Sequence, residues 1–60
     1  MTNSEKTRLL RHLNDSRRRY QANLAEINNG SAYYDRHAIQ EALDDLESII
    51  PRVEQMKVDN

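Results

Sequence analysis

The chain has 60 residues, no cysteine, one glycine and one proline, and its formal net charge is −1. A chain of this length forms one domain at most and is only marginally stable as a monomer. The lack of cysteine excludes disulfides and thiolate chemistry and fits the cytoplasm. The longest hydrophobic run covers residues 32–34, far short of the roughly 20 apolar residues of a membrane span. We therefore expect a cytoplasmic protein with no membrane contact, whose fold is completed by assembly.

The first predicted element is a helix over about 3–28. Thr2 and Glu5 have the spacing of a capping box, in which a hydroxyl and a carboxylate bind free backbone amides. A 4-3-4-3 spacing of core positions, with Lys6 and Arg17 among them, is typical of an amphipathic helix. We expect the long stem of Arg17 to pack on apolar surface with its guanidinium in water, or the residue to fix the register through an acidic partner at Asp44, Asp45 or Glu47.

The second predicted element is a helix over about 32–57, after a turn at 28–31 in which Gly30 takes the left-handed position. Pro51 lies within this helix. It falls on the polar side, where a bend is tolerated, so we expect a kink there; the alternative is a short third helix that begins at Pro51. The sparse β-branched residues argue against a β-hairpin at the Asn-Gly turn.

Two helices of similar length with a short connection form an antiparallel hairpin, so the fold class is all-α with one domain over 1–60. The apolar stripe of the second helix is wider than one partner helix can cover. We therefore expect two hairpins to form a homodimeric four-helix bundle. The predicted hairpin core and dimer interface contain Leu10, Leu13, Tyr20, Leu24, Ile27, Ile39, Leu43, Leu46, Ile49, Ile50, Val53 and Met56.

The two halves of the chain have opposite charge. Residues 1–30 contain six basic and three acidic side chains, whereas residues 31–60 contain three basic and seven acidic ones. Electrostatic matching of the two helices is one interpretation. The other is a face that contacts nucleic acid or an acidic partner, formed by four arginines on the outer side of the first helix, Arg8, Arg11, Arg18 and Arg19. The interspersed Asp15 and a pI near 6.0 weaken that interpretation.

The sequence contains no motif for catalysis or for cofactor binding. His12 and His37 are single histidines, and without cysteine the usual metal-ligand spacings are missing. Two helices also enclose too little volume for a substrate pocket. We expect no enzyme activity, no catalytic, cofactor-binding or metal-binding residue, and no small-molecule substrate.

The opening residues Met1 to Thr7 follow the pattern Met-Thr-x-x-Glu-Lys-Thr, which resembles the opening of the Rop family of plasmid RNA-binding homodimers. That resemblance implies an antiparallel four-helix dimer that binds paired RNA loops through its first helices. No RNA-contact motif of the family has a match here, so no contact residue is carried over. The size and helical plan also resemble small phage-encoded helical proteins, including head–tail joining proteins.

These observations predict a small protein-interaction or regulatory module that acts as a homodimer, with a further protein partner, and is encoded by a phage or plasmid. The alternative is a Rop-like RNA- or DNA-binding regulator that uses the basic outer face of the first helix.

Overall fold

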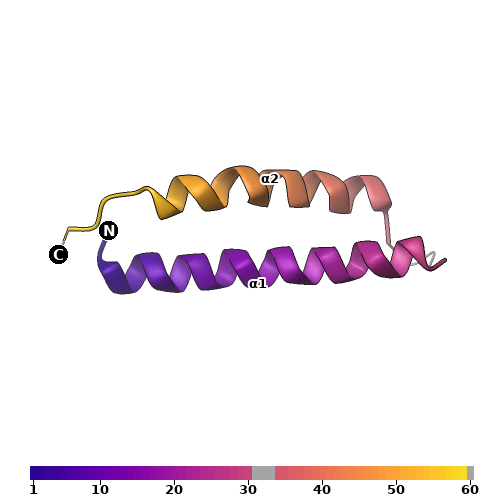
Figure 1. The fold of residues 1–60 in the computed structure, drawn as a ribbon, viewed down its shortest axis with the longest axis horizontal. Coiled ribbons are helices and arrows are strands. Elements are labelled where there is room, and N and C mark those ends of the chain that lie inside the picture. Colours follow the sequence, from indigo (N-terminus) through magenta and orange to yellow (C-terminus); the bar gives the residue numbers. More distant parts are fainter. Residues whose placement is uncertain (31–33, 60) are drawn as a thin grey trace.

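The computed structural model describes residues 1–30 and 34–59, which form two helices and no strand. Helix α1 spans Asn3–Asn28 and helix α2 spans Arg36–Glu54. The helices lie side by side and antiparallel, with both chain ends at one end of the hairpin (Figure 1). The predicted all-α hairpin is confirmed. Neither helix is long and apolar enough to cross a membrane within the described part of the chain.

The first turn of α1 is closed by the predicted capping box. The amide of Glu5 donates to Thr2 Oγ1 at 3.1 Å, and the amide of Thr2 donates to Glu5 Oε1 at 3.0 Å. These two bonds satisfy amides that have no partner inside the helix. The hydrogen bonds from Thr2 to the Glu5 carboxylate lower the pKa of Glu5, and Arg8 lowers it further.

We expect the capping box to make folding depend on pH. Because the pKa of Glu5 is lowered in the folded chain from an ordinary 4.5, its contribution is fully present above that value and is lost as the pH falls through the folded pKa. Thr2→Ala should raise the pKa of Glu5, as measured by ¹³C NMR titration of its carboxyl carbon. Glu5→Gln keeps a capping partner but removes the titration, so it should flatten the acid limb of thermal stability. An unchanged Glu5 titration in Thr2→Ala would contradict this assignment.

The C-terminus of α1 ends as the sequence predicts. Asn29 caps the helix, and Gly30 has a φ of +101°, a conformation that is strained for any residue with a side chain. The amide of Gly30 donates to the carbonyl of Ile27 at 3.0 Å. The remaining part of the predicted turn, Ser31, and the predicted start of the second helix at 32 lie outside the described residues.

Helix α2 begins later than expected, because Asp35 is its N-cap. The Asp35 carboxylate accepts hydrogen bonds from the amides of His37 and Ala38 at 2.9 and 3.3 Å. Two contacts tie this end to α1. Arg36 Nη2 donates to Asn28 Oδ1 at 2.7 Å. The negative charge of Glu26, together with a hydrogen bond to its carboxylate, raises the pKa of Tyr34.

Helix α2 also ends earlier than expected, at Glu54 rather than near 57. It continues through Pro51, so the alternative of a third helix that begins there is wrong. Beyond Glu54 the chain returns to the start of α1: the amide of Asp59 donates to the Met1 carbonyl at 2.8 Å, and the terminal ammonium pairs with the Asp59 carboxylate at 2.7 Å. Met56, predicted on the helical stripe, therefore lies outside the helix.

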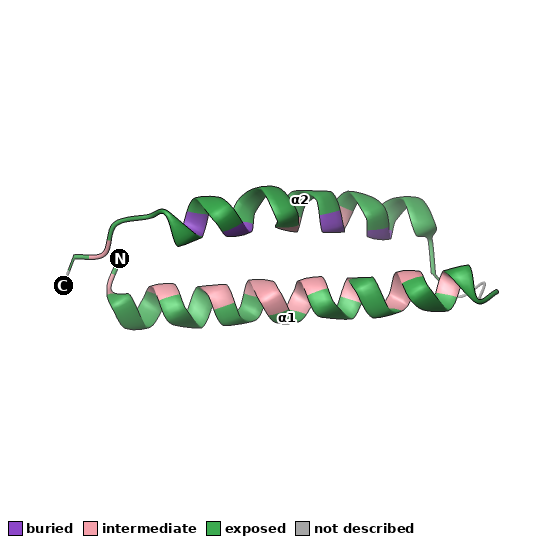
Figure 2. Cartoon of the chain, in the orientation of Figure 1, coloured by how far each residue is buried: buried purple, intermediate pink, exposed green. Residues whose placement is uncertain are grey.

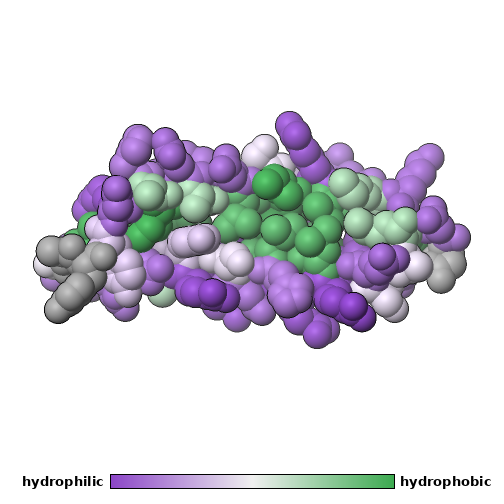
Figure 3. All heavy atoms as spheres, turned by 180° about the vertical axis from the view of Figure 1, so that it is seen from behind, coloured by the Kyte–Doolittle hydropathy of each residue, from purple (hydrophilic) through white to green (hydrophobic). Residues whose placement is uncertain are grey.

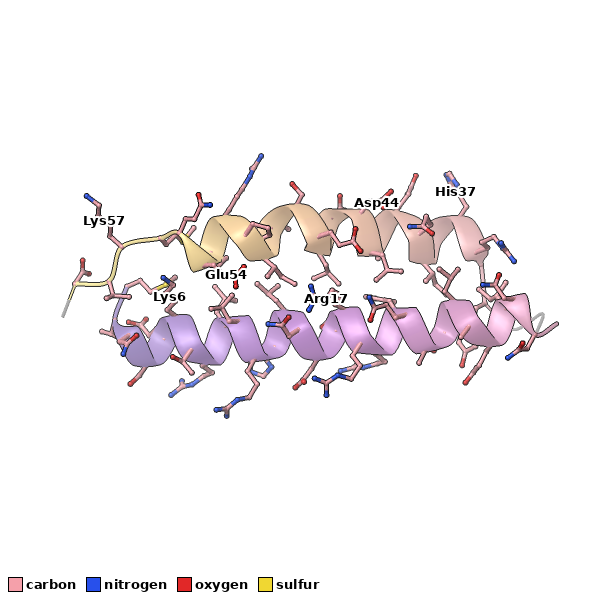
Figure 4. The ribbon with its side chains drawn as sticks, in the orientation of Figure 1. Lys6, Arg17, His37, Asp44, Glu54 and Lys57 are labelled. Atoms are coloured by element: carbon pink, nitrogen blue, oxygen red, sulfur yellow. The ribbon has the colours of Figure 1, made fainter. Side chains whose placement is uncertain are left out.

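Lys6 binds backbone carbonyls where α2 ends. Its ammonium Nζ donates to the carbonyls of Glu54 and Met56 at 2.6 and 2.8 Å, and Figure 4 shows it directed at this end of α2. The last carbonyls of a helix have no intrahelical partner and carry partial negative charge, so a cation placed there stabilises the helix end. Lys6 is thus a seam residue that joins the first turns of α1 to the last turn of α2.

We expect Lys6→Met to lower the free energy of unfolding by about 1 kcal/mol, since it keeps the apolar stem but leaves both carbonyls without their charged donor. The matched control is Lys57→Met, which makes the same change at an exposed lysine that points away from the hairpin (Figure 4). Urea denaturation followed by circular dichroism measures both. Equal losses in the two variants would show that the Lys6 bonds contribute nothing specific.

The core is thin and one-sided. In the described residues the buried side chains are Ile39, Leu43, Ile50 and Val53, all on the side of α2 that faces α1 (Figure 2). No residue of α1 is fully buried; its seam residues Leu10, Leu13, Tyr20, Leu24 and Ile27 are half-buried. A two-helix layer leaves one flank of each apolar stripe in water, which is why the apolar side chains of α1 are only half-buried.

Candidate interaction surface

One broad face of the hairpin is apolar at its centre. Figure 3 shows hydrophobic side chains gathered over the middle of both helices on this face, with polar groups around them. Two predicted interface residues, Ile49 and Met56, are 42% and 47% exposed, and Leu9 is 37% exposed. Exposed apolar side chains that form a contiguous patch with a polar rim are typical of a contact surface, whereas scattered ones are not.

Helical geometry explains why both helices contribute to this face. Successive residues turn by about 100°, so Leu9, Tyr20 and Ile27 fall on one flank of the α1 stripe. Ala38, Ala42 and Ile49 fall on one flank of the α2 stripe. Because the helices are antiparallel, the two flanks point to the same side of the layer. We call this surface the apolar face. It is defined by eight residues, all of them partly or largely exposed: Leu9, Leu13, Tyr20, Ile27, Ala38, Ala42, Leu46 and Ile49.

The dimensions of the chain suit stacking through this face. The radius of gyration is 14.1 Å, whereas a compact 60-residue domain has about 10 Å. The accessible surface is 4700 Å², against about 4100 Å² for a typical folded monomer of 7.1 kDa. The hairpin measures 47 × 16 × 11 Å, and the apolar face is one of its two largest sides. The single hairpin is therefore a layer with an excess of surface for its mass.

Arg17 lies at the seam between the two helices. Its guanidinium points between the helices in Figure 4, and its Nη2 donates to Asn14 Oδ1 at 2.8 Å. Asp44, by contrast, points away from α1. The ion pairs within residues 1–30 and 34–59 are Met1–Asp59 and His37–Glu41, so neither includes Arg17 or joins α1 to α2. The opposite charges of the two helices are thus not neutralised by contacts inside the hairpin.

The four arginines proposed as a basic face, Arg8, Arg11, Arg18 and Arg19, are all exposed. They lie on the side of α1 away from α2, with Asp15 among them. A shallow depression at the start of this side is lined by Arg8 and Arg11 together with Asn3, Ser4 and Thr7. The stripe is thus accessible along α1, but it lies about 90° around the helix from the apolar face.

The remaining titratable side chains are placed apart. His12 is exposed on α1, while His37 Nε2 lies 3.0 Å from Glu41 Oε1 on the outer side of α2. No group of three or more His, Cys, Asp or Glu side chains is positioned to hold a metal ion among the residues that the structure describes.

Comparison with known proteins identifies no relative: no family model, no curated protein and no solved structure matches this chain.

Proposed function

We propose that this chain is a non-enzymatic protein-interaction module that acts in the cytoplasm as a homodimer, with two hairpins stacked through their apolar faces in a four-helix bundle. The observation that carries the proposal is the apolar face itself, with Ile49 and Leu9 exposed beside a core that has four buried side chains in the described residues. Such a small core gives a two-helix layer little stability of its own, and oligomerisation is a common remedy in chains without disulfides.

The area of the apolar face supports this choice of partner. The broad side of the hairpin that carries the apolar face, with its polar rim, measures 47 by 16 Å, or about 750 Å², close to the roughly 800 Å² that each partner buries in a standard interface. A second copy presents a surface of the same size and hydropathy, and twofold pairing is the commonest symmetric assembly. In the proposed bundle α2 bends at Pro51, whose ring removes one backbone hydrogen bond on the solvent side.

Thermal melting at several protein concentrations tests the homodimer. Because folding and association are linked, the midpoint of the circular dichroism transition should rise by several degrees over a hundredfold increase in concentration. A midpoint that stays constant over that range would contradict a homodimer and leave a folded monomer.

The alternative function is binding of RNA or DNA through the basic outer face of α1. The observation in its favour is that Arg8, Arg11, Arg18 and Arg19 are exposed side by side along one helix. A gel-shift titration at low salt tests it, with Arg18→Glu plus Arg19→Glu as the variant and Arg52→Glu plus Lys57→Glu as a control with the same charge change at exposed positions in and after the last turn of α2. A salt-sensitive shift that only the α1 variant abolishes would support nucleic-acid binding. No shift at low salt would exclude it.

A further inference from the structure

The apolar face allows two twofold pairings of hairpin layers. If the symmetry axis runs along the helices, α1 of one copy lies over α2 of the other. If the axis runs across the helices, α1 lies over α1 and α2 over α2. Both pairings keep every pair of neighbouring helices antiparallel, so backbone dipoles do not decide between them. The charges of the two helices, by contrast, favour one pairing over the other.

Helix α1 contains six basic and three acidic residues, a net charge of +3, and helix α2 contains two basic and five acidic residues, a net charge of −3. No ion pair joins the helices within the described residues, so apart from Glu41, which contacts His37 on α2, the acidic residues of α2 remain available to a partner. The pairing of α1 over α1 would place helices of like charge together at both edges. The pairing of α1 over α2 alternates the sign around the bundle, which is the arrangement that electrostatic complementarity favours.

Register supports the same choice. The contacts of Lys6 with Glu54 and of Met1 with Asp59 fix which residues of α1 and α2 share a level along the hairpin. Counted from these contacts, Arg19 lies within one helical turn of the level of Asp45. Helical periodicity places Arg19 at the edge of the apolar face, and Asp45 at the corresponding edge on α2. An axis along the helices preserves level, so Arg19 of one copy meets the Asp45 carboxylate of the other.

We propose that in the homodimer each α1 packs over α2 of the second copy, with Arg19 set against Asp45 across the interface. This inference rests on the proposed homodimer and specifies its architecture. It also places the arginine stripes of the two copies at opposite edges of the bundle, so the stripes do not merge into one wide basic face.

Cysteine cross-linking tests this pairing cleanly, because the chain has no native cysteine. Ser16 and Asp45 share a level, and both lie at the edges of the apolar face. After oxidation, a mixture of Ser16→Cys and Asp45→Cys chains should give the mixed disulfide, since it brings Cα atoms within the roughly 4.4–6.8 Å that a disulfide spans. Ser16→Cys alone should give little product, because the two Ser16 positions then lie diagonally across the bundle.

The masses of the reduced variants separate the two proposals. A monomeric mass overturns the homodimer and, with it, the pairing. A dimeric mass without the mixed disulfide, or with an efficient Ser16–Ser16 disulfide, overturns the pairing alone.

A charge-swap cycle gives a second readout that needs no cysteine. Arg19→Glu should raise the dimer dissociation constant by about tenfold, and adding Asp45→Arg should restore most of that loss. Arg18→Glu makes the same charge change one residue away, on the side of α1 that points away from the apolar face, and should have a smaller effect. A double variant that dimerises no better than Arg19→Glu overturns the proposed contact.

Discussion

Leu43→Ala should unfold the hairpin at room temperature. Leu43 is 3% exposed and belongs to a core of four buried side chains in the described residues, so its loss removes a large share of the apolar packing between α1 and α2. Truncation of a buried leucine costs about 2–5 kcal/mol, and a domain of this size has about 3–5 kcal/mol of core stabilisation in all. Far-ultraviolet circular dichroism should therefore show loss of most helical signal.

Leu43→Met is the matched control for this variant. Methionine conserves volume and apolarity, so the substitution should cost less than about 1.5 kcal/mol and leave the helical signal intact. Periodicity places Leu43 on the side of the α2 stripe away from the apolar face, so its effect reports on the hairpin core. A Leu43→Ala chain that melts within a few degrees of the parent would contradict the core assigned here.

Ile49→Asp should abolish dimerisation. Ile49 is 42% exposed in the single hairpin, so a carboxylate there remains hydrated in the monomer. In the stacked dimer the same position is covered on both copies, and two carboxylates would lose their water. With about 2 kcal/mol for each copy, the dissociation constant should rise about 1000-fold. Sedimentation velocity over a range of concentrations measures this change.

Ser48→Asp controls for the added charge. Ser48 is the exposed neighbour of Ile49 and lies on the outer side of α2. The Ser48→Asp substitution adds the same negative charge to the same helix but outside the interface. It should leave the dissociation constant within about threefold of the parent value. Equal effects of the two substitutions would point to the net charge of α2 as their cause, and an Ile49→Asp chain that stays dimeric would remove Ile49 from the interface.

The bounds of α1 could be predicted from sequence because the signals at both of its ends are local. Thr2 and Glu5 lie three residues apart and form the capping box, and Gly30 supplies the positive φ that ends the helix. The start of α2 also has a local signal, since aspartate is among the preferred N-cap residues. Asp35 is that N-cap, whereas the apolar spacing alone allows the helix to begin anywhere between 31 and 35.

The end of α2 could not be predicted from periodicity, because a distant residue determines it. Lys6 is 48 residues from Glu54 in sequence, and its ammonium takes the place of further helical turns in satisfying the last carbonyls. The apolar spacing continues to Met56, although the helical backbone ends at Glu54. Lys6 nevertheless occupies a position on the α1 seam, and a cation at the end of a seam is a signal for a helix-capping contact between elements.

Which apolar residues of α2 are buried and which are exposed also could not be predicted from the sequence, because it depends on where α1 packs. Ile49 and Ile50 are adjacent and equally apolar, yet Ile50 is 4% exposed and Ile49 is 42% exposed. Both belong to one stripe on a helical wheel, and only the position of α1 shows which of them it covers. The acidic partners expected for Arg17 lie on α2, but Asp44 points away from α1, and it is Asn14 on α1 itself that accepts the hydrogen bond.

Sedimentation equilibrium of the unmodified chain tests the central claim most directly, since it measures mass without assuming shape. The apolar face predicts a species of twice 7.1 kDa at micromolar concentrations that dissociates on dilution. A single species of 7.1 kDa up to millimolar concentration, with the helical signal of both α1 and α2 intact, would contradict it.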